Sequence, residues 1–114
     1  MIYLAQPYTH KDPDIMELRY KAALRIVADY TRMEFLIYSP IVHYHNVAKH
    51  HNLPCHFDFW RELNLAAISR CTEVWVLPLK NWEKSLGVKA EVKHAEQAYK
   101  QITYLWEDAR RLGV

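Results

Sequence analysis

A buried strand that leads through a loop into a helix constrains the fold of this 114-residue chain more than any other feature. The apolar run 74–77 ends at Pro78, which predicts a strand over Glu73–Leu79. A polar loop follows. From Leu86 to Lys100 the apolar residues then recur at helical spacing, at Val88, Val92, Ala95 and Tyr99. A buried strand joined to a helix in this way is typical of a parallel sheet with helical crossovers.

The same alternation runs through the rest of the chain. Short apolar runs predict three further strands, at Ile2–Ala5, Phe35–Tyr38 and Ile102–Trp106. Apolar residues spaced 3.6 apart predict two further helices, one from Asp12-Pro13 to Tyr30 and one over Phe57–Cys71. We therefore expect one domain over residues 1–114. Its fold would be an α/β three-layer sandwich around a parallel sheet of about four strands, flavodoxin-like or Rossmann-like in outline.

Two segments show no regular pattern, and we expect both to lie outside the helices and strands. Glu107–Val114 is predicted to be a short polar tail. Ile41–His56 contains five of the seven histidines, His43, His45, His50, His51 and His56. No pair has HExxH spacing and no Cys/His pattern matches a zinc module, so we expect no metal. We expect a variable loop over a ligand pocket, with His43 either touching substrate or lying at the surface.

Composition excludes several classes of partner. The net charge of +2 is too small to indicate a nucleic acid polymer or an acidic membrane surface as the partner. No apolar run is long enough to span a membrane, and no signal peptide is visible. Two cysteines give no disulfide framework, which favours a reducing cytoplasm.

Polar side chains follow three of the predicted strands, in the segments Tyr3–Tyr8, Ser39–His45 and Asn81–Glu91. Because ligands of parallel sheets bind beyond the carboxyl ends of the strands, these segments should share one edge. Ser85 and Gly87 stand where a helix begins, a place that suits an anion such as phosphate. Ser85 is also consistent with a plain helix N-cap. Glu91, about one turn further on, would be a costly inward carboxylate without a partner or a role.

Two motifs resemble those of the nucleoside 2-deoxyribosyltransferase family. One is Ser85-x-Gly87-x-x-x-Glu91 after a strand and a loop with a tryptophan, and the other is the opening Tyr3-Leu-Ala-Gln-Pro-Tyr8. That family includes 2'-deoxynucleoside 5'-monophosphate N-glycosidases and short phage and bacterial proteins of unassigned role. The resemblance covers residues 1–106.

The resemblance implies cleavage or transfer at the N-glycosidic bond of a nucleotide or nucleoside, without a cofactor. Glu91 would be the nucleophile, Tyr3 would hold it by a hydrogen bond, and Ser85 would bind a 5'-phosphate. Lys84 and Lys89 nearby would also favour an anion. The implied substrate-binding residues are Ser85, Gly87, Gln6, Pro7, Tyr8, His43 and Trp82. Members of the family form homodimers or larger homo-oligomers, which we expect here too.

The chain departs from the family pattern at two positions. Asn64 stands where an Asp is usual, and an amide cannot act as an acid. Asp58 is the alternative acid, although its spacing places it on another face of the helix. Gln6 stands where a Gly is usual.

Three hypotheses therefore remain open. The first is an enzyme acting at the N-glycosidic bond. The second is a catalytically weakened nucleotide-binding protein on the same fold. The third is an unrelated α/β domain that binds protein partners and has no pocket near Glu91.

Overall fold

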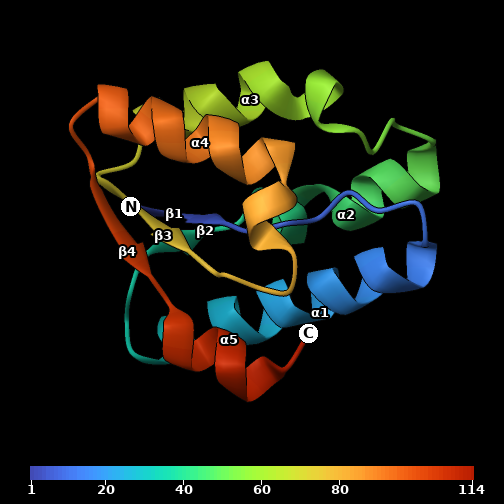
Figure 1. Ribbon diagram of the computed structural model, residues 1–114, viewed down its shortest axis with the longest axis horizontal. Coiled ribbons are helices and arrows are strands. Elements are labelled where there is room, and N and C mark those ends of the chain that lie inside the picture. Colours follow the sequence, from blue (N-terminus) through green and yellow to red (C-terminus); the bar gives the residue numbers. More distant parts are fainter.

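Four parallel strands form a single sheet in the order β2-β1-β3-β4 (Figure 1). The computed structural model describes residues 1–114 and places the strands at Ile2–Ala5 (β1), Ile37–Tyr38 (β2), Glu73–Val76 (β3) and Gln101–Tyr104 (β4). This order matches the first four strands of the flavodoxin-like arrangement. The α/β fold with a parallel sheet predicted from the sequence is confirmed.

Helices cover both faces of the sheet, which gives three layers (Figure 1). α3 and α4 lie on one face, and α1 and α5 lie on the other, while α2 lies beyond one end of the sheet. The helices are α1 (Pro13–Arg32), α2 (Pro40–His51), α3 (Phe57–Ser69), α4 (Leu86–Gln97) and α5 (Trp106–Leu112), with a 3-10 turn, η1, at Trp82–Lys84.

Strand β1 divides the core between the two layers because successive side chains of a strand point to opposite faces. Ile2 and Leu4 pack in the core beside α1 and α5. Tyr3 and Ala5 pack in the core beside α3 and α4. Because of this alternation, the Tyr3 hydroxyl projects into the layer that contains α4.

The chain changes direction across the sheet at β1. From β1 it passes to β2 on one side, and from β2 it passes to β3 on the other. Residues 2–5 of β1 pair with residues 73–76 of β3, so the two strands end side by side. Loops that leave neighbouring strands in opposite directions open a crevice at the carboxyl ends of these strands.

The segment Ile41–His56, predicted to be a variable loop, is mostly helix α2, and that prediction is wrong. Ser39 is the N-cap, since its Oγ accepts a hydrogen bond from the Val42 amide at 3.1 Å. Pro40 occupies the first turn, where its missing N–H is not needed. Asn52, with φ of 56°, ends the helix. The abundance of histidines in this segment hid an ordinary helix start.

The C-terminal segment is also a helix, although the sequence predicted a polar tail. Ala109 and Leu112 of α5 pack against the core beside α1. Trp106, predicted to end the last strand, is the first residue of this helix. An apolar pair three residues apart suffices to seat a short amphipathic helix, but it is too brief a pattern to stand out in the sequence.

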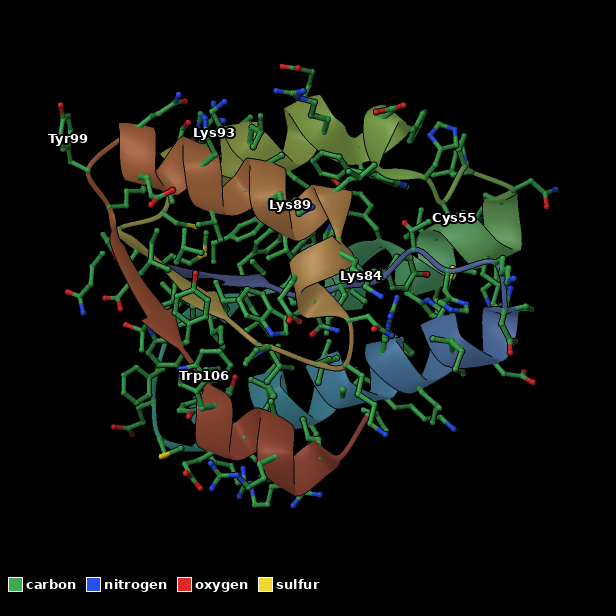
Figure 2. The ribbon with its side chains drawn as sticks, in the orientation of Figure 1. Cys55, Lys84, Lys89, Lys93, Tyr99 and Trp106 are labelled. Carbon is green, nitrogen blue, oxygen red and sulfur yellow. The ribbon has the colours of Figure 1, made fainter.

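Some predicted element boundaries shift. β2 contains only residues 37–38, β3 ends at Val76 instead of Leu79, and α4 ends at Gln97. Tyr99, predicted to continue the apolar stripe of α4, has a φ of 56° and is 96% exposed. Its side chain projects away from the protein (Figure 2). No helix in the structure combines the length and the apolar character that crossing a membrane requires.

Candidate active site

A cavity of about 340 Å³ opens at the carboxyl edge of the sheet. Its wall comes from the loop after β1, from α2, from the start of α3 and from the start of α4. The lining includes Gln6, Tyr8, Tyr44, His45, Phe57, Asp58, Asn64, Lys84, Ser85, Gly87 and Glu91. The three segments that the topology predicted to converge therefore do so. The cavity lies beside Glu91, which argues against a domain with no pocket there.

Glu91 is the most deeply placed carboxyl group of the cavity. It lies in the second turn of α4 and is 4% exposed. The Tyr3 hydroxyl donates a hydrogen bond to its Oε2. The contact expected between these two residues is thus present, and it joins β1 to α4. No cationic side chain forms an ion pair with Glu91.

Burial raises the pKa of Glu91 to about 8, and hydrogen bonds from Tyr3 and Asn64 oppose that shift. Burial, together with the neighbouring Glu91 charge, raises the pKa of Tyr3 well above its usual value. Tyr3 therefore keeps its proton and remains a donor to the carboxylate. A buried carboxyl group that lines a cavity without a cationic partner is the kind of group found at functional sites.

The N-terminus of α4 forms the part of the wall suited to an anion. Ser85 caps the helix, since its Oγ accepts a hydrogen bond from the Val88 amide at 3.2 Å. The amides of Leu86 and Gly87 have no backbone acceptor. Lys84 lies at the turn before α4 (Figure 2). It also belongs to the cavity lining. Ser85 is thus both a helix cap and a wall residue, whereas Lys89 lies outside the lining.

Gly87 permits a close contact within the protein. A Cβ atom at this position would lie 3.2 Å from Cδ1 of Phe57. This contact brings the first turn of α4 close to the first residue of α3. Phe57 and Gly87 both line the cavity.

Two polar residues of α3 reach the cavity. Asn64 is partly buried and lies close enough to Glu91 to lower its pKa. Asp58 is exposed, near the start of the helix. Asp58 and Asn64 are six positions apart in the sequence, which places them about 120° apart around the axis of α3. Both line the cavity nevertheless, because it extends along the first two turns of α3.

The loop after β1 is held by reciprocal contacts with α1. Gln6 donates from Nε2 to the Arg19 carbonyl at 2.9 Å. The buried Arg19 guanidinium donates to the carbonyls of Tyr8 and Thr9, each at 3.2 Å. Oε1 of Gln6 is buried without a partner and Gln6 lines the cavity, so a ligand could supply the missing donor.

Three residues expected at the pocket lie elsewhere. Pro7 is buried behind the wall. His43 is exposed, with its ring 4.5 Å from that of Tyr44. Trp82 packs in an aromatic cluster, 5.6 Å from Tyr104 between ring centroids, because η1 turns it toward β4. No three His, Cys, Asp or Glu side chains come close enough together to hold a metal ion.

His45 lines the cavity and was missed in the sequence. Its ring lies between Tyr8 and Glu17, with a hydrogen-bond partner on each nitrogen. A signal for it was available. Once Ser39-Pro40 is read as a helix start, Ile41, His45 and Ala48 fall on one face. All three line the cavity.

One protein-family model matches almost the whole chain. The model of a protein family described as a domain of unknown function (DUF1937) matches residues 1–108. A search of the curated proteins finds no match. The family description gives no activity, so a proposal about function depends on the geometry of the cavity and on the motif resemblance.

Proposed function

This chain belongs to the DUF1937 family, and we propose that it cleaves or transfers at the N-glycosidic bond of a deoxynucleoside or its 5'-monophosphate, with Glu91 as nucleophile. The observation that carries the proposal is the Glu91 carboxyl group. It is buried, faces a cavity, lacks a cationic partner and is held by the Tyr3 hydroxyl. The cavity volume of about 340 Å³ falls within the usual range for small-molecule sites.

The buried carboxylate is suited to the charge that this reaction creates. As the bond between C1' and the base nitrogen breaks, its electron pair goes to the base and positive charge develops at C1'. An oxygen of ionised Glu91 bonds to C1' and forms a glycosyl ester. Water or a second base then attacks C1', and the ester bond breaks to restore the carboxylate. Tyr3 keeps the attacking group oriented through both steps.

The N-terminus of α4 supports a 5'-monophosphate as the substrate. Lys84 supplies a positive charge, and two free amides and the helix dipole lie beside it. Glu91 lies about one turn along the same helix from Gly87, so a single rigid element would position the phosphate and the nucleophile. The negative charge of a nucleotide therefore matches this part of the cavity wall better than an uncharged nucleoside does.

The experiment that tests the proposal measures free base released from a panel of deoxynucleoside monophosphates and deoxynucleosides, with and without an acceptor base. The matched variant is Glu91→Gln, which keeps the size and an acceptor for Tyr3. We expect the parent to release base and the variant to release none. Release by Glu91→Gln at the parental rate would contradict the proposal.

A second candidate is a nucleotide-binding protein with weakened catalysis. Asn64 favours it, because the residue beside Glu91 is an amide instead of an acid. The bulk of Gln6 in the cavity wall favours it too. This alternative predicts that some nucleotide raises the melting temperature while no base is released by the parent.

We also propose that the chain forms a homo-oligomer, the class of partner that the motif resemblance implies. Two large apolar side chains on the helices that line the cavity are exposed, Leu63 on α3 at 51% and Leu86 on α4 at 72%. Leu86 belongs to the cavity lining. A second copy that covers these side chains would exclude water from the cavity.

A further inference from the structure

A buried histidine connects the cavity to an acidic side chain on α1. His45 of α2 is 7% exposed, and both ring nitrogens have partners. Nδ1 lies 2.6 Å from the Tyr8 hydroxyl oxygen, and Nε2 lies 2.9 Å from Oε2 of Glu17. Tyr8 and His45 line the cavity. Glu17 lies outside the lining, and its side chain is 38% exposed. The three groups thus run in a line from the cavity toward solvent.

The surroundings fix this line of groups. The Tyr20 ring stacks on the His45 ring with centroids 3.9 Å apart and planes inclined by 15°. Arg19 holds the Tyr8 carbonyl at 3.2 Å. The arrangement resembles the general pattern in which a carboxylate orients an imidazole toward a hydroxyl group.

The hydrogen bonds suit both charge states of the imidazole. The hydrogen bond from His45 lowers the pKa of Glu17, against the effect of burial, so the carboxylate stays ionised and Nε2 carries a hydrogen. In neutral His45, Nδ1 accepts from the Tyr8 hydroxyl. In charged His45, Nδ1 donates to the Tyr8 oxygen, and the Tyr8 proton is then free to point into the cavity.

We propose that Glu17, His45 and Tyr8 form a proton relay that gives the departing base a proton and later takes one back. The relay would supply the acid that Asn64 cannot supply, and it depends on the proposed glycosidic chemistry. Tyr8 is the member that touches the substrate and is therefore the catalytic residue. His45 and Glu17 act through Tyr8.

Each proton in the cycle is accounted for. In the first step the bond between C1' and the base nitrogen breaks, and the nitrogen takes the proton of the Tyr8 hydroxyl. Tyr8 takes the Nδ1 proton of charged His45, which becomes neutral, while a Glu91 oxygen bonds to C1'. In the second step the attacking water or base gives a proton to Tyr8, and Tyr8 passes one to Nδ1. His45 regains its charge, paired with Glu17.

The test compares bases that need a proton to leave with bases that do not. Guanine in dGMP needs a proton, whereas N7-methylguanine is already cationic in its nucleotide and leaves as a neutral base. For a parent that prefers pyrimidines, uracil and the more acidic 5-fluorouracil form the pair. We expect Tyr8→Phe and His45→Gln to slow release of the natural base by about 100-fold or more and to leave release of the activated base within a few fold.

The controls separate a chemical role from a structural one. His50→Gln changes an exposed histidine on the same helix, outside the cavity lining, and should leave both substrates unaffected. Glu17→Gln should slow the natural substrate only. Equal slowing of both bases by Tyr8→Phe and His45→Gln, or no slowing of either, would overturn the relay. If the glycosidic proposal itself is wrong, the parent protein will release neither base. That result would overturn the relay as well, because the relay depends on the glycosidic chemistry.

Discussion

At the scale of single residues, burial of the Glu91 carboxyl group lowers the stability of the folded protein. Its carboxyl group is removed from water, and burial raises its pKa to about 8. Tyr3 donates to it, but no cation balances its charge. A protein with no use for this group would be more stable with an uncharged residue of the same shape. The cost therefore supports a functional role for Glu91.

Stability should fall as the pH rises from about 4.5 to about 8. In this range the folded protein holds a proton on Glu91 that the unfolded chain has lost. Glu91→Gln lacks this titration, so above pH 8 it should be more stable than the parent by on the order of a few kcal/mol. Urea denaturation at pH 5 and pH 8.5 measures the difference. The same loss of stability in both proteins would contradict the assigned pKa.

For a base that leaves without a proton, the rate of release should rise with pH toward a plateau above about 8. Glu91 attacks as the carboxylate, and in the empty cavity its pKa is raised to about 8 by burial. Measurement of kcat/KM between pH 5.5 and 9 reports this ionisation in the free enzyme. If Glu91 served as the proton donor instead, kcat/KM would fall over the same range.

Residue-level prediction succeeded for the contact between Tyr3 and Glu91 and failed for residues whose direction depends on a local turn or helix. The sequence predicts that Tyr3 holds Glu91, and the two residues are in contact. The sequence prediction for the segment that forms α2 is His43, from the motif resemblance, and it misses His45, because without this helix the two histidines cannot be assigned to faces. Trp82 was placed at the pocket by its position in the motif loop, whereas the 3-10 turn directs it to an aromatic cluster.

At the scale of elements, α4 carries the site. The turn before it and its N-cap present Lys84 and Ser85 to the cavity, and its second turn presents Glu91. The strand, the loop and the helix of this unit were predicted from apolar spacing alone. α2 was not, because its many histidines hid the helix start at Ser39-Pro40. α5 was not, because its apolar pair, Ala109 and Leu112, is too short a pattern to stand out.

Substitutions at Ser85 should separate its role as a cap from its role with a ligand. Ser85→Ala removes the hydrogen bond to the Val88 amide and should lower the free energy of unfolding by about 1 kcal/mol. Ser85→Asp keeps a good N-cap and stability, but places a negative charge where a phosphate would bind. We expect it to raise KM for monophosphates and not for nucleosides. An equal KM change for both substrates would rule out phosphate binding at this position.

At the scale of the whole molecule, the strand order places the cavity. β1 and β3 are neighbours in the sheet but not in the sequence, and the chain leaves them in opposite directions. Strands and helices alternate along the sequence, which predicts a parallel sheet. The carboxyl edge of that sheet could therefore be predicted as the ligand site. The boundaries of the cavity were not predictable, since they depend on how α2 and α3 close over the edge.

Light scattering on the purified chain should give a mass of at least twice the 13.6 kDa of one copy. Association would cover the exposed side chains of Leu63 and Leu86. Leu63→Glu, on the solvent-facing side of α3, should shift the mass toward that of one copy and leave the melting temperature of the monomer intact. A parent that remains at 13.6 kDa at high concentration would contradict the oligomer.

Trapping of the covalent intermediate tests the central claim most directly. Fluorine at C2' withdraws electrons from C1', so a 2'-fluorinated nucleotide should slow both steps and let the glycosyl ester accumulate. We expect the mass of the protein to rise by that of the fluorinated sugar phosphate, with the added mass on the peptide that contains Glu91 and no adduct on Glu91→Gln. Release of the base without any adduct, or an adduct on another residue, would show that Glu91 is not the nucleophile.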